Sequence, residues 1–81
     1  PFYCDYGYNI RLGDGVFLNF GCTLLDVTAI IIGNGCQIGS HVQLLTADHP
    51  RDSALRREGW ESGKPITLGQ NVWVGSGALI L

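Results

Sequence analysis

Aliphatic residues recur every six positions along most of this chain, and this period constrains the fold more than any other feature. They fill three registers, separated first by a shift of two residues and then by a long interruption. A helix requires apolar spacings of three and four, and a simple alternating strand does not reset every six residues. A six-residue period is typical of one short strand plus one turn, and it predicts a parallel β-helix. The nine positions are Leu12, Leu18, Leu24, Ile32, Ile38, Leu44, Leu68, Val74 and Ile80.

Three six-residue units predict a triangular coil in which each aliphatic side chain points inward and stacks on its counterparts in neighbouring coils. Glycines directly after many of the aliphatic positions supply the turns, as at Gly13, Gly33 and Gly69. A single coil does not bury its own inner face, so stability accumulates from stacking. We therefore expect the 81 residues to form one partial all-β domain, whose uncovered end packs end to end or is only marginally stable alone.

Two irregularities interrupt the repeat. The two-residue shift between Leu24 and Ile32 predicts a small bulge at a corner, near residues 27–30. The gap of 24 residues between Leu44 and Leu68 is polar and carries most of the charge. We interpret residues 47–64 as a loop extruded from the coil, and long loops in compact domains usually carry function or are disordered.

Charge, hydropathy and cysteine content exclude several classes of protein. The net charge of −2 shows no cluster of one sign, which argues against nucleic acid or an anionic membrane as a partner. No apolar stretch is long enough to cross a bilayer, so a cytoplasmic protein is expected. Three cysteines without a C-x-x-C spacing argue against a disulfide framework and a zinc site, and Cys4, Cys22 and Cys36 are interpreted as small core residues.

Beyond the repeat, four parts of the chain carry distinctive residues: 4–10, 19–20 with 25–26, 46–50, and 63–69 with 71–75. These stretches resemble the hexapeptide-repeat acetyltransferases, specifically the maltose, galactoside and nodulation-type O-acetyltransferases. The individual repeats are weak signals, because hexapeptides occur in many enzymes. The His-Pro dipeptide in the loop, followed by Lys-Pro-Ile-Thr and Asn-Val-Trp, is more specific.

The resemblance implies a left-handed coil and a homotrimer with active sites between neighbouring subunits. It implies acetyl-CoA as co-substrate, with no metal. It also implies an N-terminal helical segment and further C-terminal coils, which are expected to be missing from this chain. The later coils hold several of the family's contacts to coenzyme A.

His49 is the candidate catalytic base. Acetyl transfer from a thioester to a hydroxyl requires a group that accepts the hydroxyl proton, donors for the developing oxyanion and groups that position the acceptor. Histidine is the side chain most often used as a base near neutral pH, and a positioned base is worth roughly 10²–10⁴ in rate. His49 lies at the root of the loop beside Pro50, and the resemblance implies that it is the base. His41, in a polar slot of the repeat, is interpreted as a surface residue.

Four further residues are candidates for binding the acceptor. The resemblance implies this role for Asn19, Asp26 and Asp5. The alternative for Asn19 is a stacked, hydrogen-bonded residue of the interior or a corner, and the alternative for Asp5 is a plain turn aspartate. Glu61 is near His49 across the loop in the sequence, and it is expected to orient the imidazole or to bind the acceptor. Trp60 beside it would line the acceptor pocket or pack the loop onto a neighbour.

Two residues are candidates for contact with acetyl-CoA. Ser76 matches a family residue near the thioester, where its backbone N–H would face the acetyl carbonyl; the alternative is a plain turn serine. Trp73 falls in an outward slot of the repeat, and an exposed indole there indicates a subunit interface or the pantetheine channel.

Other functions stay open at this point. A structural β-helix that is truncated or has lost its chemistry would keep the same repeat, and some relatives acetylate antibiotics instead of sugars. A γ-type carbonic anhydrase would need three histidines to hold zinc, and the chain has two. The function expected is direct acetyl transfer to a sugar or related hydroxyl compound.

Overall fold

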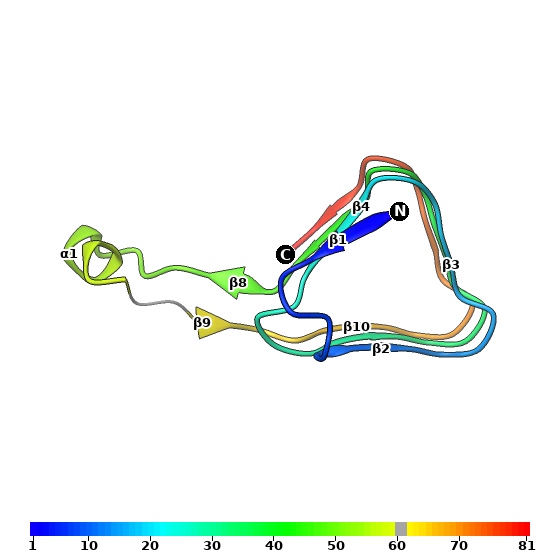
Figure 1. The fold of residues 1–81 in the computed structure, drawn as a ribbon, viewed down its shortest axis with the longest axis horizontal. Helices are drawn as coiled ribbons and strands as arrows, with labels where there is room; N and C mark the ends of the chain where they lie inside the picture. The colour runs from blue at the N-terminus through cyan, green and yellow to red at the C-terminus, as the bar shows by residue number, and fades with distance from the viewer. Residues whose placement is uncertain (60–61) are drawn as a thin grey trace.

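The computed structural model of the chain describes residues 1–59 and 62–81, which wind into a parallel β-helix of triangular coils with an arm at one corner (Figure 1). The elements follow one another around the triangle, coil after coil. They are β1 (Phe2–Cys4), β2 (Ile10–Leu12), β3 (Phe17–Leu18), β4 (Cys22–Leu25), β5 (Ile30–Ile32), β6 (Gln37–Ile38), β7 (Gln43–Leu45), β8 (Ala47–Asp48), α1 (Ser53–Arg57), β9 (Ser62–Gly63), β10 (Ile66–Leu68), β11 (Trp73–Val74) and β12 (Leu79–Ile80).

Three parallel sheets form the sides of the triangle. Their strand orders are β1-β4-β7-β12, β2-β5-β10 and β3-β6-β11. Leu24 pairs with Leu44, and Ile32 pairs with both Leu12 and Leu68, so the aliphatic positions of successive coils lie in register. The predicted left-handed parallel β-helix is confirmed.

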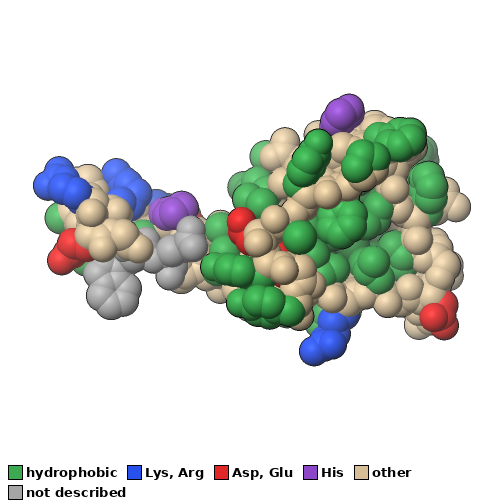
Figure 2. Space-filling view, viewed as in Figure 1, with side chains coloured by type: hydrophobic (Ala, Val, Ile, Leu, Met, Phe, Trp, Pro, Cys, Tyr) green, Lys and Arg blue, Asp and Glu red, His purple; other side chains and the backbone are tan. Residues whose placement is uncertain are grey.

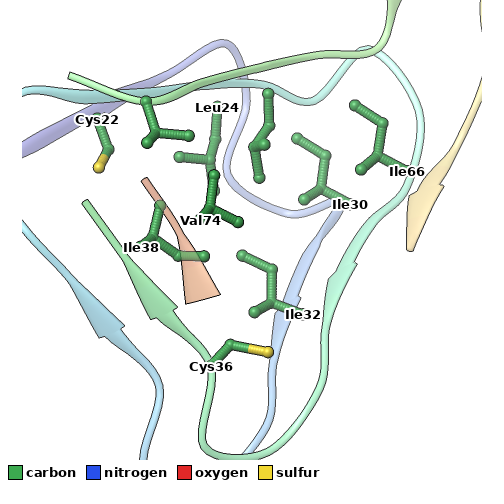
Figure 3. Packing of buried hydrophobic residues seen from close by; sticks show 10 residues of the cluster. Cys22, Leu24, Ile30, Ile32, Cys36, Ile38, Ile66 and Val74 are labelled. Carbon is green, nitrogen blue, oxygen red and sulfur yellow. The ribbon is translucent and has the colours of Figure 1, made fainter. Parts of the chain in front are cut away.

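The core is a column of aliphatic side chains and two thiols inside the triangle (Figure 3). Leu24, Ile32, Ile38 and Leu44 are at most 1% exposed, as the repeat predicted, whereas Leu12 of the first coil is 48% exposed. Stacking from both sides therefore makes the difference between a buried and an exposed position of the same repeat.

The cysteines divide into two kinds. Cys22 and Cys36 are buried, and their thiols donate to backbone carbonyls, Cys36 to Gly69 at 2.9 Å. Cys4 is exposed, so its interpretation as a core residue was wrong. The physical reason is its place in the first coil, where no further described coil covers the inner position.

The corner after the β3-β6-β11 side needs left-handed backbone in every coil. Gly21, His41 and Gly77 occupy it with φ of 76°, 58° and 78°. The backbone N–H of His41 donates to Phe20 in the coil before, and a Cβ on Gly21 would lie 2.5 Å from the His41 imidazole. His41 is exposed, as expected, and it is also a turn residue whose ring packs against the preceding coil.

The predicted loop is an arm with its own secondary structure. Strands β8 and β9 pair antiparallel, and the short helix α1 forms the tip. The arm comprises residues 47–63, and the repeat pattern did not predict the helix within it. Asp52 caps this helix, because its carboxylate accepts from the backbone N–H of Ala54 and Leu55. Among the described residues, no helix combines the length and the apolar content needed to span a membrane.

Candidate active site

His49 lies on the arm directly after β8, and its backbone is held from both sides. Its N–H donates to Asp48 Oδ1 at 2.9 Å, and its carbonyl accepts from the guanidinium of Arg51 at 3.2 Å. The same guanidinium nitrogen donates to Asp48 Oδ1 at 3.1 Å. The side chain of His49 is exposed on an arm where basic side chains gather (Figure 2).

Charged side chains next to His49 also stabilise the conformation of its backbone. The hydrogen bond from Arg51, followed by the one from the His49 N–H, lowers the pKa of Asp48, so its carboxylate is ionised at neutral pH. Arg56 of α1 donates to the carbonyls of Pro50 and Arg51, at 2.9 and 2.6 Å. Two arginines and one carboxylate thus fix the path of the chain on either side of His49.

Asp26 lies at the corner of the coil from which the arm departs, and it is 0% exposed. Its Oδ1 accepts from the N–H of Tyr6, and its Oδ2 accepts from the N–H of Gly7 and Asn9. Burial by itself raises the pKa of Asp26, but these three hydrogen bonds outweigh it and hold the pKa below the usual value. The expected direct contact of Asp26 with an acceptor does not fit this structure, because no part of the side chain is accessible.

Asn19, Trp73 and Ser76 come together on the β3-β6-β11 side of the triangle. They border a groove of about 170 Å³. The Oδ1 of Asn19 accepts from the N–H of Phe20, and the Oγ of Ser76 accepts from the N–H of Ser40. Trp73 is 80% exposed, which confirms its predicted outward orientation. The other residues of the groove are Phe17, Gln37, Ile38 and Gly39.

The candidate residues therefore form two groups on opposite sides of one copy. Figure 1 shows the arm at the corner that faces away from the β3-β6-β11 side, where the groove lies. Asp5 is exposed in the turn between β1 and β2, at the same corner as the arm. Glu61, and Trp60 beside it, lie outside the described residues.

Two features of this site were not found from the sequence. Arg51 and Arg56 were not identified as residues of the site, because their bonds to the backbone around His49 depend on the fold of the arm. A cavity of about 240 Å³ at the root of the arm, bordered by Asp48, Arg51 and Lys64 among others, was not predicted either. Within residues 1–59 and 62–81, no three His, Cys, Asp or Glu side chains gather as metal ligands would.

Comparisons with known proteins bear on the whole chain. No protein-family model matches it. Nodulation protein L of Rhizobium leguminosarum bv. viciae is 51% identical over 81 residues, which are 100% of this chain and 43% of that protein. The crystal structure of a maltose O-acetyltransferase from Clostridium difficile 630 superposes with a TM-score of 0.95 at 46% identity, covering 98% of this chain and 42% of that one.

A second solved structure is a galactoside acetyltransferase in complex with coenzyme A. It has a TM-score of 0.86 at 34% identity, over 98% of this chain and 42% of the other. The chain thus spans about two fifths of the length of the relatives that it matches. Together with the coil, the arm and the His-Pro sequence, these similarities show that residues 1–81 belong to the hexapeptide-repeat acetyltransferase family, in its maltose, galactoside and nodulation-type branch.

Proposed function

We propose that the protein containing these residues transfers the acetyl group of acetyl-CoA to a hydroxyl of a sugar or related acceptor, with His49 as general base. The observation that carries this proposal is the match of coil and arm together to a maltose O-acetyltransferase, at a TM-score of 0.95. A second structural relative is described in complex with coenzyme A, which supports acetyl-CoA as the donor.

The proposed reaction is a direct transfer in a ternary complex. The acceptor oxygen attacks the carbonyl carbon of the thioester while His49 takes the hydroxyl proton. The C–S bond breaks, an ester forms, and coenzyme A leaves as its thiolate, which is then protonated. A covalent acetyl-enzyme is not needed, and Cys22 and Cys36 are buried, where a thiol is a poor nucleophile.

The groove of Asn19, Trp73 and Ser76 is the proposed meeting point of donor and acceptor. Ser76 follows a glycine at an exposed corner, so a thioester carbonyl can approach its backbone. Trp73 offers a large exposed ring to the pantetheine arm. Asn19 would hold an acceptor hydroxyl through its amide.

A homotrimer is the proposed assembly. His49 and the groove lie on opposite sides of one copy, so a complete site requires the arm of one subunit beside the groove of its neighbour. Cyclic assembly supplies this arrangement at each of its identical interfaces.

The test is a thiol-release assay on the protein at its natural length, with acetyl-CoA and a panel of sugars, galactosides and amino sugars. We expect His49→Ala to lower turnover by roughly 10²–10⁴. His41→Asn is the matched control, because asparagine tolerates the left-handed backbone at that position, and it should retain wild-type turnover. A wild-type protein that acetylates no acceptor would contradict the proposal and favour a silent structural β-helix.

A further inference from the structure

The turn between β1 and β2 is held by hydrogen bonds to the carboxylate of Asp26. Tyr6 N–H donates to Oδ1 at 2.9 Å, and the N–H groups of Gly7 and Asn9 donate to Oδ2 at 2.8 and 3.1 Å. Hydrogen bonds to an ionised carboxylate are stronger than those between neutral groups. One buried side chain of the second coil therefore fixes three backbone donors within a four-residue stretch, 6–9, of a turn in the first coil.

The turn also binds back to the segment around Asp26. The side-chain amide of Asn9 donates to the carbonyl of Asp26 at 2.8 Å and to that of Val27 at 3.3 Å. Gly7 has φ of 90°, a conformation that glycine adopts without strain. Five hydrogen bonds thus hold a turn whose own side chains, apart from Asn9, face outward.

This turn carries an exposed polar and aromatic surface. Asp5 is exposed at its start. Tyr6 and Tyr8 stack on each other, with ring centroids 5.2 Å apart and planes inclined by 26°. Asp26 itself is 0% exposed, so its effect on any ligand must pass through the turn.

The same corner carries the arm. Leu24 pairs with Leu44, which places Asp26 and Thr46 at equivalent positions of successive coils. The hydroxyl of Thr46 donates to the carbonyl of Leu25 at 2.6 Å and accepts from the N–H of Thr28 at 3.1 Å. The arm begins at the residue after Thr46. The turn with Asp5 is therefore bound to Asp26, and the arm with His49 starts beside Thr46, at equivalent positions of two successive coils.

We propose that Asp26 is a positioning residue for the acceptor, which touches no substrate and acts by fixing the turn of residues 5–9 so that Asp5 faces the acceptor beside the arm. This inference rests on the proposed function. It assigns to Asp26 an effect on the acceptor alone, because none of the residues of this turn borders the groove whose Trp73 and Ser76 are proposed to contact acetyl-CoA.

The test compares Asp26→Asn with Asp26→Ala in the protein at its natural length. An asparagine oxygen can still accept from Gly7 and Asn9, but its NH₂ group then faces the N–H of Tyr6. Asp26→Asn should raise the KM for the acceptor substrate by about tenfold, and Asp26→Ala should raise it further. The reason is that losing a hydrogen bond to an ionised carboxylate costs at least the free energy that corresponds to a tenfold change in an equilibrium constant. The kcat and the KM for acetyl-CoA should stay near wild-type values. Should Asp26→Ala fail to fold, the nearly isosteric Asp26→Asn carries the test.

Asn34→Ala is the matched control. The side chain of Asn34 also accepts from a backbone N–H of the coil before it, that of Asp14 at 2.8 Å, but at a different corner. This variant should leave both KM values unchanged. Hydrogen exchange gives a readout independent of catalysis, since the amides of Tyr6, Gly7 and Asn9 should exchange faster in Asp26→Asn and not in Asn34→Ala.

The outcomes separate the two proposals. An unchanged acceptor KM in Asp26→Asn, or a parallel rise in the KM for acetyl-CoA, would overturn the positioning role and leave acetyl transfer intact. A wild-type protein without turnover on any acceptor would overturn the proposed function itself, and this inference with it.

Discussion

The coil and the arm of this chain are stabilised by different kinds of interaction. In the coil, ten hydrophobic residues are buried in one column, and parallel strands repeat the same register from coil to coil. In the arm, helix α1 has no buried residue, and its hydrogen bonds are local ones to Asp52, Arg51 and the carbonyl of Pro50. Figure 2 shows the same contrast, with hydrophobic side chains over the coil and basic ones on the arm.

This difference means that the coil supplies most of the stability and the arm supplies a proposed catalytic residue. Burial of apolar surface supplies most of the stability of a small domain, and the coil has nearly all of it. The arm carries the proposed base on a frame of exposed polar contacts, which contribute little stability but set a geometry. Changes in the coil should therefore alter unfolding, and changes in the arm should alter activity or local order.

The largest effect on stability is expected in the middle of the coil. Leu24→Ala should lower the free energy of unfolding by about 2–5 kcal/mol, because it leaves a cavity between two stacked coils. Leu55→Ala, at a leucine of the arm that is 44% exposed, should change it by less than about 0.5 kcal/mol. Urea denaturation of both variants measures the difference. Equal losses would show that the arm packs as firmly as the coil.

A smaller effect should follow the charge of Asp26. Its pKa is lowered in the folded state, so it stabilises the fold above the ordinary aspartate pKa of about 3.9, and this contribution is lost as the pH falls through the folded-state value. The difference in unfolding free energy between wild type and Asp26→Asn should be largest at neutral pH and narrow below pH 4 or so. Denaturant titrations at a series of pH values test this. A difference that does not change with pH would mean that the carboxylate is not ionised in the fold.

The smallest effect is expected at the cap of the arm helix. Asp52→Ala removes the acceptor for the N–H groups of Ala54 and Leu55 and should destabilise α1 by about 1 kcal/mol. Faster hydrogen exchange within α1, with an unchanged melting temperature of the coil, is the expected result. A lower melting temperature would tie the arm to the cooperative unit of the coil and remove the distinction between the two regions.

The sequence predicted the coil well because its information is periodic. The inward positions of Leu24, Ile32, Ile38 and Leu44 follow from the six-residue spacing, and the two-residue shift after Leu24 appears as the irregular segment 26–29 between β4 and β5. Exposure of Leu12 and of Cys4 depends on how many coils lie above them, which a local repeat does not encode.

The candidate site was predicted less completely, because its contacts are not periodic. Asp26 was singled out as a residue that binds the acceptor, yet its bonds to Tyr6 and Gly7 cross from one coil to the next over 20 and 19 residues. Only the register of the coils brings these residues together. The arm helix was missed because five residues are too few to show a helical period. The roles of His49, Asn19, Asp5, Glu61, Ser76 and Trp73 stay predictions.

The most direct test is complementation between two inactive variants. His49→Ala removes the proposed base from the arm, and Asn19→Ala removes the proposed acceptor contact from the groove. Neither protein alone should therefore acetylate the acceptor at an appreciable rate. If the active site is shared between copies, trimers refolded from an equal mixture should recover roughly a quarter of wild-type activity, the fraction of interfaces at which an intact arm meets an intact groove. No recovery from mixed, correctly folded trimers would contradict a site built from the arm of one copy and the groove of the next.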